Sequence, residues 1–362
     1  MTDCAPASPG PDEVPLLRLG TPTDLLEVIP YLLGFHPTES LVVVMLHGRG
    51  SRVGATLRYD LPRVEPGLFV HDVAAHAALH ADHAVVLVYT ERPRIADGLP
   101  EWPLVSLTTE ALRRANVRVA DCLCVADGRW WSYHCLDPQC CPADGRPLAF
   151  ADAPSSHIAA ATARAGLVAL PDRAALAKTL DPVDGSVRAA MERALATAET
   201  AFVDTVATAG GIAAWRAWMR GRIQRAGERA LAGHGAPGTH VLSDEESAEI
   251  LVALSDVPIR DACWLKAERG RSGDNLALWS QLARRAVPPY DAAPLFLLGW
   301  VAWRRGDGAL ARIAAQRALA SDAGYGAARL LLDAMDSAVD PRRFPRLTAG
   351  RRARRRAAGR RR

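Results

Sequence analysis

The residues best suited to chemistry in this chain are cysteines gathered around one β-hairpin. Two stretches with strand character, 117–125 and 129–135, flank Asp127-Gly128, a dipeptide typical of tight hairpin turns. Side chains alternate between the faces of a strand, so the hairpin cysteines share one face. Thiolates from a strand end and from the following loop, LDPQCCPADG, are suitable ligands for a tetrahedral zinc ion. The candidate zinc ligands are Cys122, Cys135, Cys140 and Cys141.

Two other interpretations of these cysteines stay open, a redox-active pair and buried structural thiols. The segment has no C-x-x-C spacing, and neighbours such as Cys140 and Cys141 seldom both bind one ion. Cysteine is also among the residue types most often buried, where it acts as a small hydrophobic side chain. A reactive thiol needs exposure, which a sequence does not reveal. The pattern therefore favours structural thiols over zinc binding or redox chemistry.

The opposite face of the hairpin places Asp121 directly across from His134, with Ser132 two residues before that histidine. Asp, His and Ser are the residue types of a catalytic triad. Residues two apart on one face of a strand lie about 7 Å from each other, whereas a hydroxyl–imidazole hydrogen bond spans about 3 Å. The spacing therefore predicts a structural pair of Asp121 and His134 rather than a triad.

Polar residues also surround the apolar run 41–46, the first strand expected in the chain. His36 and Glu39 precede this run, while Arg58 and Asp60 share the less apolar face of the next strand. Loops at strand ends are the usual ligand positions of α/β domains, which makes these four residues candidates for a ligand pocket. The alternative, which we favour, is a surface loop beside a structural Arg58–Asp60 pair.

Motifs that bind nucleotide phosphates are missing from the sequence. No G-x-x-x-x-G-K-[ST] motif occurs, and Gly48, Gly50 and Gly54 lie between two expected strands rather than before a helix. We therefore do not expect nucleotide-dependent catalysis.

Positive charge is concentrated at the C-terminal end. The segment 342–362 has eleven arginines and no acidic residue, which leaves 33 basic against 40 acidic residues elsewhere, a net charge of −7. A polycationic segment binds phosphates without sequence preference, but no aromatic residue follows Phe344 to stack on bases. Non-specific nucleic-acid contact and a solvated tail without a dedicated ligand are both open interpretations.

Length and composition indicate a globular protein of about two domains, with 362 residues, of which 49% are hydrophobic and 23% charged. The apolar stretch 295–303 is much shorter than the roughly 20 residues that span a bilayer. The N-terminal segment lacks the basic and apolar regions of a signal peptide. Seven cysteines, an odd number, do not suggest a secreted disulfide framework. We expect a cytoplasmic protein that does not contact membranes.

Hydrophobic patterning divides the chain into two structural classes. In the N-terminal part, expected strands alternate with expected helices and include the hairpin, which indicates a mixed sheet. From residue 156 onward the apolar residues recur with helical spacing. The expected segments are a disordered N-terminus (1–15), an α/β domain (16–150), an all-α helical domain (151–340) and a disordered Arg-rich tail (341–362).

The last helices expected carry a weak repeat pattern. Gly299, Gly306, Ala311 and Ala318 have the spacing of small residues in a tetratricopeptide unit, where they let two helices pack closely. The usual leading Trp and closing Pro are absent, and arrays generally need about three units or more. The C-terminal part is therefore tetratricopeptide-like, either through plain hairpin packing, which we favour, or as a surface for a protein partner.

Four stretches of the sequence carry a family resemblance. They are LGTPTDLLEVIPYLLGFHPTESLVVV (19–44), RYDLP (58–62), GRWWSYHCLDPQCCPADGRP (128–147) and LGWVAWRRGDGALARIAAQRALASDAGY (298–325). Through them the chain, over about residues 16–340, resembles an actinobacterial family known as domain of unknown function 4192. The resemblance implies no activity, cofactor or catalytic residue.

Together these observations favour a non-enzymatic protein that binds a protein partner through its C-terminal helices or a small ligand through its α/β domain. One alternative is a hydrolase-like enzyme with a site near His36, Arg58 and Asp60. Another is a nucleic-acid-associated protein that acts through its Arg-rich tail. A docking surface would expose a contiguous apolar patch on the helices of 293–339, whereas an enzyme would have a concave site around His36.

Overall fold

The computed structural model describes residues 19–48, 52–62, 66–92, 98–148, 157–208, 210–232, 242–267, 272–341 and 343–344. Contacts divide the chain into two compact units, 1–175 and 176–362, and each is described by itself. The disordered N-terminus expected at 1–15 and all but three residues of the tail 341–362 lie outside the described residues.

The first helix, α1 (Pro22–Leu33), has a sequence signal at each of its ends. Thr21 Oγ1 accepts the backbone N–H of Asp24, and the Asp24 carboxylate accepts the backbone N–H of Thr21. This reciprocal capping box satisfies backbone donors that a helix start leaves unpaired. Gly34 ends the helix in the left-handed region, with φ 80°, which glycine adopts without strain.

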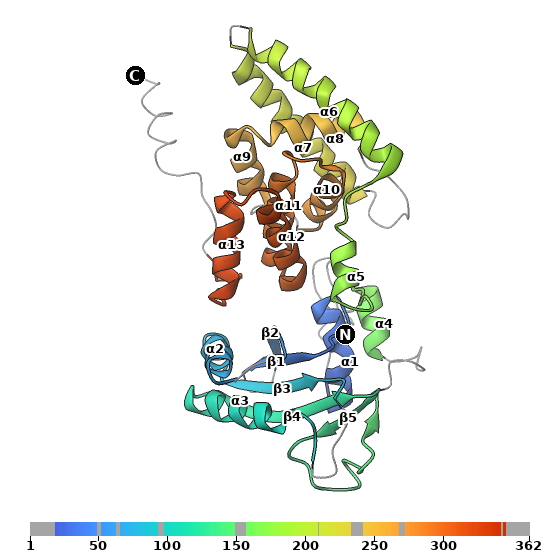
Figure 1. The fold of residues 1–362 in the computed structure, drawn as a ribbon, viewed down its shortest axis with the longest axis vertical. Helices are drawn as coiled ribbons and strands as arrows, with labels where there is room; N and C mark the ends of the chain where they lie inside the picture. Colours follow the sequence, from blue (N-terminus) through green and yellow to red (C-terminus); the bar gives the residue numbers. More distant parts are fainter. Residues whose placement is uncertain are drawn as a thin grey trace, which may run out of the picture. The chain divides into compact units, whose positions relative to one another are not determined.

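The first unit contains a six-stranded sheet in the order β2-β1-β3-β4-β5-β6 (Figure 1). Its strands are β1 (Ser40–His47), β2 (Arg52–Asp60), β3 (His83–Tyr89), β4 (Arg118–Ala126), β5 (Arg129–Ser132) and β6 (Arg146–Pro147). β3 and β4 are parallel, and the other neighbours are antiparallel. The mixed sheet expected for the N-terminal domain is therefore confirmed.

Two helices, α2 (Gly67–Ala78) and α3 (Trp102–Arg114), lie side by side and share a core with one face of this sheet (Figure 1). Apolar side chains of both helices fill it, among them the fully buried Leu112. Burial of such a side chain stabilises the fold by about 1.5–3 kcal/mol. Cys122 and Cys124 belong to the same core, so two of the hairpin cysteines take part in its packing.

The hairpin between β4 and β5 forms around Asp127-Gly128, as the sequence predicts. Cys124 pairs with Trp131 in the expected register. Both turn residues have positive φ, 50° and 68°, as a type I′ turn requires. β5 is shorter than expected, because it ends at Ser132 rather than at Cys135.

The first unit extends beyond the last strand. Helix α4 (His157–Arg164) contacts α1, and Leu170 exchanges backbone hydrogen bonds with Gly34 and His36. The boundary expected after residue 150 marks the end of the strands, whereas the contacts place the residues up to 175 with the sheet.

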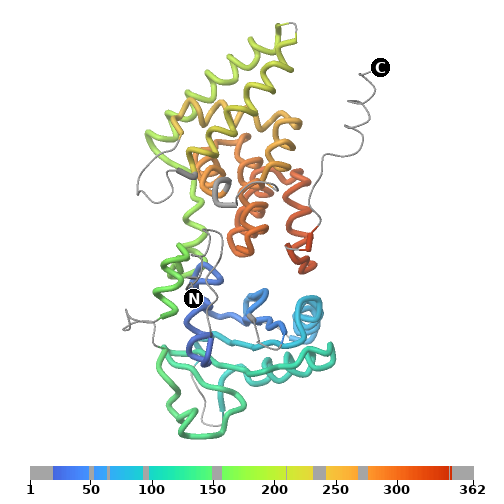
Figure 2. Tube along the Cα trace, turned by 180° about the vertical axis from the view of Figure 1, so that it is seen from behind, coloured from blue at the N-terminus to red at the C-terminus, as the bar shows by residue number. Residues whose placement is uncertain are grey.

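Every regular element among the described residues of the second unit is a helix (Figure 2). After α5 (Arg173–Lys178), which spans the division, the helices are α6 (Gly185–Val206), α7 (Gly211–Ala232), α8 (Asp244–Ala253), α9 (Val257–Ala267), α10 (Ser272–Arg285), α11 (Ala292–Arg305), α12 (Gly308–Ser321) and α13 (Gly326–Asp336). Consecutive helices from α10 to α13 pack against each other. In α11 every residue from Pro294 to Trp303 is buried, which explains its nearly continuous apolar sequence.

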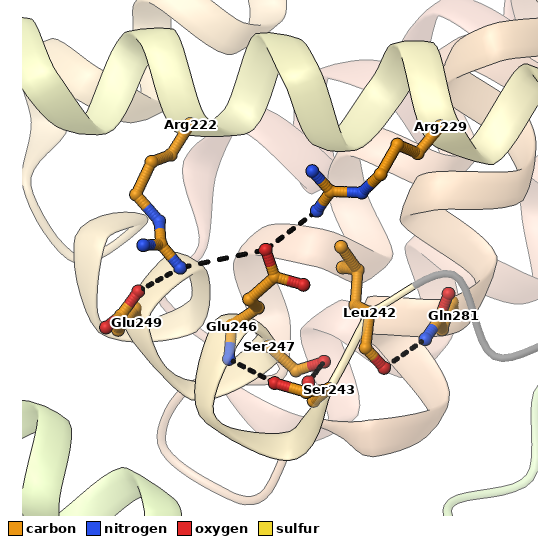
Figure 3. A network of polar contacts seen from close by, with 8 residues as sticks. All are labelled: Arg222, Arg229, Leu242, Ser243, Glu246, Ser247, Glu249 and Gln281. Carbon is orange, nitrogen blue, oxygen red and sulfur yellow. Dashed lines mark hydrogen bonds and ion pairs between the residues drawn. The ribbon is translucent and has the colours of Figure 1, made fainter.

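Arginine–glutamate contacts join α7 to α8 (Figure 3). Arg222 pairs with Glu249 at 2.6 Å, and Arg229 pairs with Glu246 at 2.8 Å. The four side chains are between 25% and 46% exposed, so each pair contributes at most about 1 kcal/mol. Each charge of this network has a partner inside the protein, and its role is to position the two helices.

The surface of the C-terminal helices does not show the patch that partner docking requires. Among the described residues of 293–339, Leu330 is the one large apolar side chain that is exposed. No described helix is both long and apolar enough to cross a membrane.

Candidate functional site

Three thiols meet in the loop that joins β5 to β6, residues 133–145. The Sγ atoms of Cys135, Cys140 and Cys141 all lie within 4.8 Å of one another. Cys140 is exposed, and the other two are half-buried. Within the described parts of the chain, no other group of three or more His, Cys, Asp or Glu side chains is close enough to hold a metal ion.

Ser132 sets the start of this loop. Its Oγ accepts the backbone N–H groups of His134 and Cys135, both at 3.2 Å, and donates to Asp121 Oδ1 at 2.9 Å. Hydroxyl-to-backbone bonds of this kind compete with a strand ladder, which explains why β5 ends here. Asp121 therefore helps to position the Cys135 backbone through Ser132.

Two arginines hold the rest of the loop by its carbonyl groups. Arg146 donates to the carbonyl groups of Gln139, at 3.0 Å, and of Cys140. Arg129 donates to those of residues 144 and 145, at 3.2 and 3.0 Å. A guanidinium group has five donors in one plane, so it can gather several carbonyl groups of an irregular segment. The arginines thus help to order the segment that carries Cys140.

Trp131 and Gly145 close the loop against the sheet. The Trp131 indole donates from Nε1 to the Ala143 carbonyl at 3.1 Å. Gly145 has φ 73°, and a Cβ atom at this position would come within 2.4 Å of the indole ring. Both its backbone conformation and its contact therefore require glycine.

A hydrogen bond links the ionisation of Cys135 to that of Cys141. A backbone hydrogen bond from Asp137 and a side-chain hydrogen bond with Cys141 lower the pKa of Cys135. Burial raises the pKa of Cys141 to about 11, and its hydrogen bond with Cys135 acts in the same direction. Cys135 is therefore the first of this pair to become a thiolate, the form of cysteine that binds metals and reacts as a nucleophile.

Cys122 does not belong to this group, although the sequence places it among the zinc ligands. Its side chain is fully buried, and its Sγ lies 3.5 Å from Thr109 Oγ1. Burial raises the pKa of Cys122 to about 11. Because β5 ends before Cys135, that residue leaves the sheet face on which Cys122 and Cys124 stay. These two cysteines have the surroundings expected of structural thiols.

The structure does not bring Asp121 and His134 together as a pair. Asp121 bonds to Ser132 instead, and the strand register that would align it with His134 stops two residue pairs earlier, at Leu123 and Ser132. The His134 ring packs edge-on against Trp102, with ring centroids 6.4 Å apart.

The four pocket candidates near the first strand take part in holding the fold. Arg58 donates to Ser40 Oγ at 2.8 Å and pairs with Asp60 at 2.7 Å. Glu39 Oε1 accepts the backbone N–H of residue 91 at 2.6 Å. Burial lowers the pKa of His36, whose backbone bonds to residue 170. These contacts support the structural interpretation of Arg58 and Asp60 rather than a catalytic one.

Sequence reasoning missed the residues that shape the thiol loop. They are Arg129, Trp131, Asp137, Gly145 and Arg146. Two turn sequences, Asp137-Pro138 and Asp144-Gly145, were the available signal. Asp137 Oδ1 accepts the backbone N–H two residues on, at 2.9 Å, and this turn brings Cys135 close to the later cysteines.

A comparison with protein families gives one match. The family described as domain of unknown function (DUF4192) matches residues 22–342. The matched range includes all six strands, helices α1 to α13 and the whole thiol loop. Neither the curated proteins nor the solved structures that were searched contain a match.

Proposed function

The chain belongs to the DUF4192 family, and we propose that it binds one zinc ion through the thiolates of Cys135, Cys140 and Cys141. The observation that carries this proposal is the mutual distance of the three Sγ atoms, all within 4.8 Å. Zinc–sulfur bonds of about 2.3 Å at tetrahedral angles place two sulfurs about 3.8 Å apart. A small contraction of the group is therefore enough to hold the ion.

The donor atoms and the organisation of the loop both support this choice of ion. Soft thiolate ligands favour zinc or cuprous copper over magnesium and calcium, which take oxygen ligands. The backbone bonds of Arg129 and Arg146 order the loop before an ion arrives, which lowers the entropic cost of binding. The backbone bond from Asp137 to Cys135 is an outer-shell contact of the kind that stabilises a metal-bound thiolate.

The identity of the fourth zinc ligand distinguishes a structural zinc site from a catalytic one. Closed structural zinc sites usually have four protein ligands, whereas catalytic sites have three and a water molecule. We propose metal binding alone as the function, and an enzyme that acts through this zinc ion, with water as the fourth ligand, is the alternative. We also place the protein in the cytoplasm, because reducing conditions keep thiols available as ligands.

The proposal is tested by metal analysis of the full-length chain. Protein equilibrated with zinc and then dialysed against metal-free buffer is expected to retain one zinc per chain in elemental mass spectrometry. Cys135→Ser, Cys140→Ser and Cys141→Ser are each expected to weaken binding at least about 100-fold. Cobalt substitution supplies a second readout, since the thiolate-to-cobalt charge-transfer band reports bound sulfur.

Cys263→Ala is the matched control, because Cys263 is a buried thiol of the second unit. It is expected to keep the zinc content and the cobalt band unchanged. Failure of the wild-type chain to bind zinc, or equal binding by all four variants, would overturn the proposal. A zinc-free chain with a disulfide among the three cysteines would favour the redox interpretation instead.

For the second unit, we propose that α11 and α12 form a tetratricopeptide-like hairpin. A Cβ atom added to Gly299 would lie 3.1 Å from the Ala311 carbonyl oxygen, which shows how closely the two helices approach. Gly299→Val is expected to lower the free energy of unfolding by about 1–3 kcal/mol in urea titrations. Gly308→Val is the control, since nothing lies within 4 Å of its added Cβ. Equal losses in both variants would contradict close helix packing.

A further inference from the structure

A hollow of about 330 Å³ opens in the second unit between α7, α9 and α10. Small-molecule sites commonly have volumes of about 300–1,000 Å³. The floor of this hollow is apolar, since Ile223, Leu278 and Trp279 are each at most 6% exposed. The polar side chains at its rim are Arg220, Gln224, Glu228 and Lys266. An apolar floor with a few polar groups at the mouth is the usual composition of a ligand site.

Gly227 keeps part of this floor open. It lies inside α7, where glycine costs about 0.5–1 kcal/mol relative to alanine. A Cβ atom at Gly227 would meet only Leu278, at 3.8 Å, which is an ordinary contact. Packing therefore does not exclude a side chain here, in contrast to Gly299, where the neighbouring helix does. Glycine at position 227 therefore leaves this part of the hollow unfilled.

The charges at the rim are unbalanced. Arg220 and Lys266 come from two different helices, and neither has a carboxylate partner among the residues that the structure describes. The Glu228 carboxylate accepts a hydrogen bond from Gln224 Nε2 at 3.0 Å. Two cations without partners next to an apolar floor favour a ligand with a negative charge.

We propose that this hollow binds a small molecule with a flat apolar body and one anionic group, a carboxylate or a phosphate. The body packs on Trp279, Leu278 and Ile223, and the anionic group lies at the rim with Arg220 and Lys266. The site is independent of zinc binding and belongs to a different unit of the chain.

The test uses three probes of the same size and shape on the zinc-equilibrated full-length chain. Isothermal titration calorimetry is expected to give a dissociation constant on the order of 100 µM for 2-naphthoate. The neutral 2-naphthylmethanol is expected to bind about tenfold more weakly, and the cationic 2-naphthylmethylamine more weakly still. Equal binding of the three probes, or no binding of naphthoate at millimolar concentration, would overturn the proposal.

Two kinds of variant locate the binding. Gly227→Leu fills the hollow and is expected to abolish naphthoate binding, while Gly221→Leu, on the same helix but outside the lining, keeps it. Arg220→Glu combined with Lys266→Glu is expected to reverse the preference toward the cationic probe. Circular dichroism and zinc content verify that each variant is folded. Naphthoate binding that survives both Gly227→Leu and the charge reversal would show that the probe binds elsewhere.

Discussion

Arginine side chains have different partners in two polar regions of the first unit. These regions are the thiol loop of residues 133–145 and the group around Arg58. Arg58 bonds to side chains, the Ser40 hydroxyl and the Asp60 carboxylate, so the polar groups of that region satisfy each other. In the thiol loop, Arg129 and Arg146 bond to backbone carbonyls instead. The loop is ordered while its three thiols are left to face one another. Side chains stay available for chemistry where the backbone supplies the structural partners.

Apart from changes to the three ligands themselves, the largest effect is expected from Gly145→Ala, which adds a Cβ atom within 2.4 Å of the Trp131 ring at a residue with φ 73°. The loop must shift, and we expect zinc affinity to fall about 100-fold, equivalent to about 2.7 kcal/mol, in competition titrations with a chelator. Gly166→Ala is the control, because it has a similar φ of 68° and open space around its Cβ. Equal zinc affinity in the two variants would show that the conformation of the loop at Gly145 does not affect metal binding.

Arg58→Ala is expected to act on stability alone. Its side chain is 15% exposed, and the loss of a largely buried hydrogen bond from a charged group costs about 2 kcal/mol. Urea unfolding is expected to show this loss, while the zinc content stays at one ion per chain. Zinc loss at unchanged stability would show that Arg58 contributes to the metal site, which would contradict a purely structural role for this residue.

Arg146→Ala is expected to have a smaller effect on zinc, because Arg129, Trp131 and the Ser132 turn still hold the loop. Loss of an outer-shell contact typically weakens metal binding about tenfold. Arg146→Lys restores one donor and is expected to recover part of the affinity. The same chelator competition measures both variants, and an unchanged affinity in Arg146→Ala would mean that the carbonyl contacts do not prepare the site.

The smallest effect is expected in the helical network. Glu246→Gln removes the charge that pairs with Arg229, at a side chain 33% exposed, and we expect a loss below about 1 kcal/mol. Zinc binding is expected to be unaffected, since α8 lies in the other unit. A larger loss in urea unfolding would show that this network stabilises the fold more than exposed ion pairs usually do.

Local sequence patterns were sufficient for most of the fold. The cap at Thr21, the turn at Asp127-Gly128 and the apolar run of β1 are each fixed by interactions within a few residues. The boundary at residue 150 followed the change from strands to helices, whereas α4 is held by its contact with α1, far away in the sequence.

The site was harder to predict than the fold. Three of the four zinc ligands expected from the sequence do lie together. Strand alternation wrongly added Cys122 to them, because it assumes that β5 continues to Cys135. The side-chain bonds of Ser132 that end β5 earlier are not visible in a hydrophobic pattern. The carbonyl contacts of Arg146 likewise depend on the folded path of the loop. Asp60 lies two residues after Arg58 on the same face of β2, so that pair could be anticipated from strand alternation.

The central claim is most directly tested by X-ray absorption at the zinc edge on the zinc-equilibrated full-length chain. We predict three sulfur scatterers at about 2.3 Å and one oxygen or nitrogen scatterer at about 2.0–2.1 Å. A shell of oxygen and nitrogen alone, without sulfur, would contradict zinc binding by the three thiols.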